Sequence, residues 1–439
     1  MFPDGPGARR GRPRSAAWAS LLLCGGAICP QLAAAKETLT VDLSAGAEIS
    51  SNPLLETGGK AAVGAQAGID ANYNVDGERT DFNIAAAAHS SSYFDGRGTD
   101  LAGSISGSLQ HRLSPRATLG AVGHYSYTRS SGFNYLLTSG GPSLFPPQGP
   151  DSPANGASGT GSSANTAAPA ALVTQATLPG GGVILPPDTT LIGRRIGQHS
   201  WGGAVNFDYQ TSERSTLTLA ADANVTNYND STLSNYRMFG QAVAFAHAIS
   251  AATKVSAQAR IAEVTYDNGE HDVIATPMVG IERKLSPTFD LAVYGGASIV
   301  HTRLPDGIRL HSSSFAASVK LCGRLSRGQF CLSGDRQELP SALGGVRAAT
   351  LARAIYSTRL NRNDTIDLGL SYDQRGRDTR NLFPNQTTVG GSARYEHHFG
   401  NRLAAYVSAG YLHFSQSGIP GRSELRGGVG IAYRFGDQG

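Results

Sequence analysis

Long stretches of this sequence alternate between apolar and polar residues. Residues 38–50 read TLTVDLSAGAEIS, with every second residue apolar, and residues 63–75 repeat the pattern. A period of two residues puts the apolar side chains on one face of a β-strand and the polar side chains on the other. An amphipathic helix would need a period of 3.6 residues, which these stretches do not show. The pattern predicts long strands with two chemically different faces.

The same alternation recurs along the chain and predicts about 18 strands. The other segments are 81–94, 101–113, 117–128, 199–211, 215–227, 235–249, 254–266, 272–285, 289–301, 312–325, 329–337, 346–360, 365–374, 387–399, 402–413 and 424–435. The alternation is least clear in 329–337. Such a count is typical of an all-β protein built from consecutive hairpins.

Short polar turns between these segments recur at a spacing of about 38 residues. RLSPRATL at 112–119 and KLSPTFDL at 284–291 are two of them. Longer polar connections alternate with the short turns, for example at 51–62, 228–235 and 415–422. Short turns at one end and longer loops at the other are typical of outer-membrane barrels. An even number of strands then places both termini at the short-turn end, in the periplasm.

The sequence therefore predicts a closed antiparallel transmembrane β-barrel. In hydrocarbon every backbone group needs a partner within the protein, which a sheet achieves only by closing on itself. The chain has 439 residues, of which 16% are charged, and no window supplies the 18 or more apolar residues that a spanning helix needs. The alternative is a soluble sandwich or propeller that buries the apolar face in a core.

The predicted barrel spans residues 36–439, after a secretory signal at 1–35. Four arginines between Arg9 and Arg14 precede the apolar run 16–28, and three alanines end at Ala35. The alternative for this segment is an uncleaved anchor. The stretch 129–198 interrupts the repeat and is rich in Gly, Ser and Pro, which predicts a long extracellular loop. It is either a disordered surface loop or a segment that folds inward and narrows the pore.

Two cysteines remain after the signal, Cys322 and Cys331, in a compartment that permits disulfides. They flank the turn at 326–327. If Leu325 pairs with Gly328, the two cysteines lie opposite each other at a non-hydrogen-bonded position, where side chains are closest. A disulfide that fastens this hairpin is expected, and two buried thiols are the alternative.

The polar face of the predicted strands is the candidate lining of a lumen, because a charge that faces lipid near the midplane costs about 2–4 kcal/mol for Arg or Lys. The candidate lumen-facing residues carry both signs of charge, so strong ion selectivity is not expected. They are Asp70, Arg112, Asp208, Asp222, Arg237, Arg260, Glu282, Arg353, Arg394 and Glu396. The alternative is that these charges pair with each other, fill the lumen and leave little conductance.

No catalytic, metal or cofactor motif is evident in the sequence. The eleven histidines are dispersed, and His397 and His398 point to opposite faces of one strand. HExxH, GxSxG, P-loop and CxxC patterns are absent from the sequence. The scattered basic residues form no nucleic-acid patch. We therefore expect a protein that is not an enzyme and that needs no cofactor, metal or nucleic acid.

The last predicted strand, GGVGIAYRFGDQG, ends in aromatic residues that include Tyr433 and Phe435. It is similar to the terminal-strand signal that the barrel-assembly machinery reads, although four residues follow Phe435. The stretches EISSNPLLET near residue 50 and PSALGGVRAATLARAIYSTRLNRNDTIDLGLSY from residue 340, with the repeated turns, resemble the outer-membrane β-barrel porins of the porin-2 or OmpL-like type. That family is often encoded with exopolysaccharide genes.

This resemblance implies a porin of about 18 strands in the bacterial outer membrane. Outer-membrane lipid and lipopolysaccharide would be its surroundings, and exopolysaccharide is the solute or partner that the family association suggests. The expected function is a passive aqueous channel, tied in that case to polysaccharide export or assembly. The alternative is a structural or surface-interaction barrel that displays the 129–198 loop around a closed lumen.

Overall fold

The computed structural model describes residues 36–96, 98–129, 195–378 and 384–436, and these form an antiparallel sheet of 18 strands. Within these ranges no helix is long and apolar enough to cross a membrane. The predicted signal at 1–35 and nearly all of the predicted 129–198 loop lie outside the described residues. The fold class expected from the alternation is confirmed.

The strands are 13–18 residues long, which suits a tilted crossing of a bilayer. Their bounds are β1 Lys36–Ser50, β2 Ala62–Asp76, β3 Thr80–Tyr93, β4 Thr99–Ser114, β5 Ala117–Arg129, β6 Gly197–Ser212, β7 Ser215–Tyr228, β8 Tyr236–Ser250, β9 Thr253–Tyr266, β10 His271–Ser286, β11 Phe289–Arg303, β12 Arg309–Leu325, β13 Gly328–Pro340, β14 Val346–Arg359, β15 Asp364–Asp378, β16 Gln386–His398, β17 Leu403–Gln416 and β18 Ile419–Gly436.

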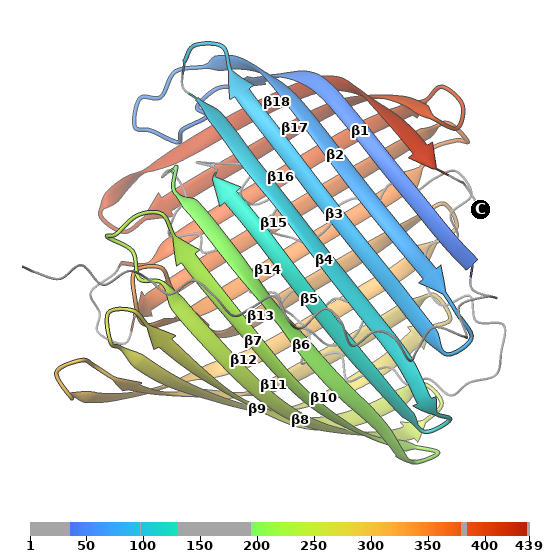
Figure 1. The fold of residues 1–439 in the computed structure, drawn as a ribbon, viewed down its shortest axis with the longest axis vertical. Helices are drawn as coiled ribbons and strands as arrows, with labels where there is room; N and C mark the ends of the chain where they lie inside the picture. The colour runs from blue at the N-terminus through green and yellow to red at the C-terminus, as the bar shows by residue number, and fades with distance from the viewer. Residues whose placement is uncertain (1–35, 97, 130–194, 379–383, 437–439) are drawn as a thin grey trace, which may run out of the picture.

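Each strand pairs with its neighbours in the sequence, and β1 also pairs with β18, so the sheet closes into a barrel (Figure 1). The register of the strand pairs gives the shear of the barrel. A path that steps from each residue to its partner on the next strand returns to β1 about 22 residues from where it began. A shear of this size tilts the strands by about 40° from the barrel axis. With strands about 4.8 Å apart, the backbone cylinder has a radius on the order of 18 Å.

The outer face of the barrel is apolar. Leu43, Ile261 and Leu425 are among the large apolar side chains that stay 40–62% exposed there. Exposed aromatic residues lie toward both ends of the strands. Nearer the longer connections they are Tyr125, Trp201, Phe239, Phe315, Tyr372 and Tyr411, and nearer the short turns they are Tyr209, Phe245, Tyr395, Tyr433 and Phe435. An apolar band between two aromatic girdles is the exterior that a bilayer requires.

The connections differ between the two ends of the barrel. Those at the end that holds 77–79, 115–116 and 213–214 are two to four residues long, and we call it the short-turn end. The opposite, long-loop end was expected to hold a loop at 415–422. That expectation is wrong, because the β17–β18 ladder continues to the pair Gln416–Ile419. Gly418, at a φ of 84°, closes the tight turn that remains.

The β12–β13 hairpin carries the two cysteines. Leu325 pairs with Gly328 and Cys322 with Cys331, which is the register counted from the sequence. The two Cα atoms are 4.1 Å apart and the sulfur atoms form a disulfide. The bond therefore fastens β12 to β13 close to the short-turn end.

Candidate functional site

The inner face of the barrel is lined mainly by polar side chains that contact one another. Nine of the ten predicted lumen residues lie on this face, as the strand registers show. Several lie within 3.2 Å of a basic or acidic partner. Arg260 Nη2 is 2.9 Å from Asp222 Oδ2, and His89 Nε2 is 3.2 Å from Asp70 Oδ1. The inner wall is therefore hydrophilic, with much of its charge balanced locally.

The remaining predicted residues on this face have local partners as well. Arg394 Nη2 is 2.7 Å from Glu396 Oε2, and its guanidinium lies 4.1 Å over the ring of Tyr406. Asp208 accepts hydrogen bonds from Thr218 and Asn206, and Glu282 accepts one from Tyr294. Arg112 lies near the short-turn end, and Arg353 lies on β14 opposite Ser333.

Arg237 does not lie on the inner face, so its assignment to the lumen was wrong. On β8 it alternates with the inward residues Tyr236 and Met238, and it is exposed beside the outward Phe239. It is the second residue of its strand, at the long-loop end. There a long arginine side chain can reach lipid headgroups instead of hydrocarbon, so the position tolerates a charge.

A buried ionic network crosses the seam where β18 meets β1. Arg426 Nη2 is 2.7 Å from Glu424 Oε1 and donates to Tyr93 Oη at 3.0 Å, and its Nη1 is 3.5 Å from Glu48 Oε2. Glu424 also accepts a hydrogen bond from Ser50. The network links the last strand of the barrel to the first strand and to β3. We call these residues the closing network.

The β13–β14 hairpin bends into the barrel at the long-loop end. Among the described residues β13 pairs with β12 only over Ala317–Leu325, although β12 begins at Arg309. Beyond Arg336 the hairpin passes over the inner face of β12, where Glu338 accepts a hydrogen bond of 2.7 Å from Ser314. We call residues 337–349 the inward tip.

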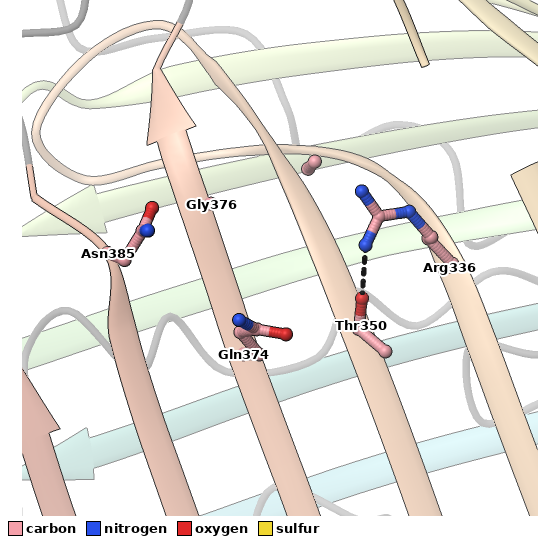
Figure 2. Close-up of a pocket in the computed structure, with 6 residues that line it drawn as sticks. Arg336, Thr350, Gln374, Gly376 and Asn385 are labelled. Carbon is pink, nitrogen blue, oxygen red and sulfur yellow. Dashed lines mark hydrogen bonds between the residues drawn. The ribbon is translucent and has the colours of Figure 1, made fainter. Parts of the chain in front are cut away.

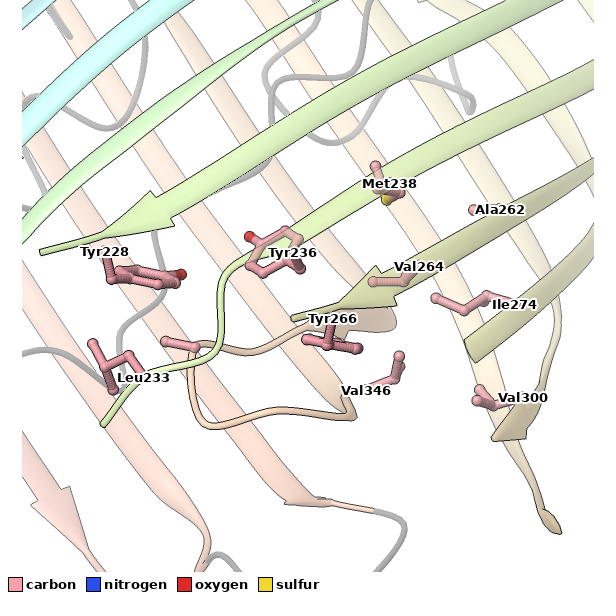
Figure 3. Close-up of a cluster of buried hydrophobic side chains, with 11 residues drawn as sticks. Tyr228, Leu233, Tyr236, Met238, Ala262, Val264, Tyr266, Ile274, Val300 and Val346 are labelled. Atoms are coloured by element: carbon pink, nitrogen blue, oxygen red, sulfur yellow. The ribbon is translucent and has the colours of Figure 1, made fainter. Parts of the chain in front are cut away.

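The inward tip reaches the wall formed by β7–β11. Tyr266, the last residue of β9, donates from its hydroxyl to the carbonyl of Gly345 at 2.7 Å, and the Ser234 amide donates to Ala342 O at 2.7 Å. Because β9 and β13 are not neighbours in the sheet, these contacts can only be made through the interior. Figure 3 shows the loop of the tip beside Tyr266 and Val346.

The wall that receives the tip is apolar, unlike the rest of the lining. Met238, Val264, Ile274 and Val300 face inward and are at most 4% exposed, and they pack with Val346 and Ala342 of the tip. Full burial of each such side chain contributes about 1.5–3 kcal/mol, so the tip is held firmly. On β8–β11 these apolar residues occupy inward positions where the alternation predicts polar ones. They were the sequence signal for the docked tip, which the strand pattern alone did not reveal.

The inner face is polar, and the inward tip occupies part of the barrel interior at the long-loop end. Across the described ranges, no group of three or more His, Cys, Asp or Glu side chains could hold a metal ion. Tyr433 and Phe435 point outward near the short-turn end, with ring centroids 4.6 Å apart, and their role as an assembly signal stays a prediction.

No family model matches this sequence, and no curated protein matches it. The porin-2 or OmpL-like resemblance therefore stays a prediction. Solved structures that are similar in fold are outer-membrane proteins. OccK2 of Pseudomonas aeruginosa shares 8% identity, with 92% of this chain and 99% of that chain covered and a TM-score of 0.42. The outer-membrane protein OpdK of the same organism shares 8% identity, with 91% of this chain and 99% of that chain covered and a TM-score of 0.42.

A BenF-like porin from Pseudomonas fluorescens Pf-5 shares 9% identity, with 93% of this chain and 100% of that chain covered and a TM-score of 0.41. Scores this low carry no argument about function. The geometry of the chain itself is more informative, because a closed ladder, an apolar exterior and a polar interior suit hydrocarbon outside and water inside. These features place the chain in a bacterial outer membrane.

Proposed function

We propose that this chain forms a passive aqueous channel across the outer membrane. The observation that carries the proposal is the polar inner face of an 18-stranded ring. Barrels of 16–18 strands are wide enough to leave an aqueous channel. A backbone radius on the order of 18 Å leaves space inside even after side chains line the wall. Hydrophilic solutes would cross by diffusion.

The inward tip sets the width of the channel at the long-loop end. It leaves the wall beyond Arg336 and packs against Val264 and Tyr266 on β9, so part of the cross-section there is occupied by protein. Its backbone is fixed at Ala342 and Gly345 by hydrogen bonds to the facing wall. A fixed constriction of this kind would limit the size of solutes more than their charge, since the lining carries both signs.

A polysaccharide is the finer proposal for the solute. The sequence resemblance suggests it, and the chemistry of the lining supports a neutral, hydroxyl-rich chain. Ser44, Gln66 and Thr276 face inward and are partly exposed. Their hydroxyl and amide groups can donate to and accept from the hydroxyls of a sugar chain. Export or assembly of exopolysaccharide would use such a lining.

Single-channel recording in planar bilayers tests the channel. The mature protein should conduct, and shortening residues 341–345 to Asn-Gly should raise the conductance, about 1.5-fold or more if the tip limits flow. The matched control shortens the five-residue connection 304–308, which lies at the same end and is mostly exposed. The control should leave the conductance unchanged. Pure, folded protein without conductance would exclude the channel.

The second candidate is a closed barrel that displays the 129–198 segment for surface interactions. The observation that favours it is that charged residues on the inner face pair with each other, as Asp222 does with Arg260 and Arg394 with Glu396. Such pairing would also suit a lumen filled by side chains. Deleting 130–194 discriminates the two functions. A closed display barrel would stay silent in the bilayer with or without the segment and would lose its surface binding.

A further inference from the structure

A polar recess interrupts the apolar exterior on β13–β15. It is lined by Arg336, Ala348, Thr350, Gln374, Gly376 and Asn385 and has a volume of about 220 Å³. Figure 2 shows Arg336 and Thr350 on neighbouring strands, Gln374 on the next strand and Asn385 just before the strand after it. The recess lies where the hairpin bends into the barrel, so the wall is indented at this point.

The strand registers place the recess on the outer face. On β15, Gln374 and Gly376 continue the row of Leu368, Leu370 and Tyr372, which are 36–65% exposed. Tyr372 belongs to the aromatic girdle at the long-loop end, and Gln374 comes directly beyond it. Because such girdles mark the level of the headgroups, the recess lies at the headgroups of the outer leaflet.

The lining can donate hydrogen bonds and carries a positive charge. Arg336 Nη1 donates to Thr350 Oγ1 at 2.9 Å, which leaves the rest of its guanidinium for a ligand. The Tyr372 hydroxyl donates to Gln374 Oε1 at 3.2 Å and so leaves the amide nitrogen as the group for the recess. Asn385 supplies a second amide. No carboxylate is among the six lining residues. The nearby Glu338 attracts the Arg336 guanidinium electrostatically, but it is hydrogen-bonded to Ser314 and does not line the recess.

We propose that this recess binds the phosphorylated headgroup of an outer-leaflet glycolipid. An arginine with neighbouring amides and a hydroxyl is the set of donors that a phosphate oxygen cluster prefers. Free phosphate shares this chemistry, but the site lies beside lipid-facing Leu370 and Tyr372, where the acyl chains of a bound lipid would continue along the barrel. The lipid is therefore the expected occupant.

Native mass spectrometry of the detergent-solubilised barrel tests the site with three probes. These are bis-phosphorylated lipid A, the same lipid without phosphates, and inorganic phosphate. Arg336→Gln should weaken binding of the phosphorylated lipid about tenfold, as loss of one charge-assisted contact implies. Gln374→Glu, which adds a repulsive carboxylate, should weaken it as well. Arg237→Gln is the matched control, since Arg237 is an outward arginine at the same end on β8.

Heat-dependent gel mobility serves as the folding control, and every variant should match the parent barrel in it. The binding results can then be compared directly. Weakened binding of the phosphorylated lipid in both recess variants, with Arg237→Gln unchanged, supports the site. Equal binding by Arg336→Gln and the parent overturns it. Equal binding of the lipid without phosphates also overturns it, and inorganic phosphate that displaces the lipid at the same concentration assigns the recess to free phosphate instead. None of these results depends on conductance.

Discussion

Two regions of the inner wall are held by opposite means. At the seam between β18 and β1, the closing network places Arg426 between Glu424 and Glu48, all nearly inaccessible to solvent. On the facing side, the inward tip rests on apolar residues such as Val264 and Ile274, with a few hydrogen bonds to its backbone. Both regions join elements that are distant in the sequence or in the sheet.

The difference reflects what each contact has to specify. Paired charges with hydrogen bonds are directional, and a slip of one residue at the seam would separate Arg426 on β18 from Glu48 on β1 and turn one of the two toward lipid. Apolar packing is tolerant of small shifts and suits a loop that only has to stay docked. We infer that the network secures the register of closure, whereas the apolar patch sets the position of the constriction.

The largest expected effect comes from Arg426→Met. This change leaves Glu424 and Glu48 buried without their cation, and it should lower the free energy of unfolding by about 3–5 kcal/mol. Urea unfolding of the barrel in lipid vesicles, followed by the fluorescence of the outward Trp201, measures it. Adding Glu48→Gln and Glu424→Gln to the same chain should recover most of the loss. A stability equal to that of the parent would show that the seam does not depend on these charges.

A smaller effect is expected at the base of the hairpin whose tip is docked. Reducing the Cys322–Cys331 bond should lower the free energy of unfolding by about 2–3 kcal/mol in the loop-entropy view. The conductance should stay the same, because the bond is near the short-turn end, away from the tip. A chain with both cysteines replaced by serine should not respond to the reductant. A change in conductance on reduction would mean that the base of the hairpin controls the position of the tip.

The smallest effect is expected for Tyr266→Phe. It removes the hydrogen bond to Gly345 O but keeps the ring packed, so the free energy of unfolding should fall by about 0.5–1.5 kcal/mol. A less firmly held tip should show itself as added noise in the open-channel current. Tyr406→Phe, at an inward tyrosine away from the tip, serves as the control. Equal noise in the two variants would argue that the tip is not held by its hydrogen bonds.

Most of the barrel could be predicted from the sequence because each strand faces lipid on one side and water on the other. Its residues therefore alternate between apolar and polar. The segment at 329–337 was the least clear, and it forms part of β13 (Gly328–Pro340), where the outward row ends in Arg336. The cysteine register followed from one turn, since a two-residue connection at 326–327 fixes every pair of the hairpin.

The inward tip and the side of Arg237 could not be read from alternation alone. Pro340–Gly345 has the composition of any turn, and the direction in which the hairpin bends depends on partners two to five strands away from β13 around the barrel. The inward apolar residues Met238, Val264 and Val300 carried that information, but only as exceptions to the pattern. Arg237 was misplaced because every charge in a strand was assigned to water, which does not hold at strand ends.

The pairing of β1 with β18 means that the two ends of the chain become neighbours. Since β18 follows all the other described strands in the chain, the ring cannot close until β18 has been made. Until then β1 and every newly made hairpin expose strand edges that could add to any other chain. An unclosed precursor with exposed strand edges is thus inherent in this topology.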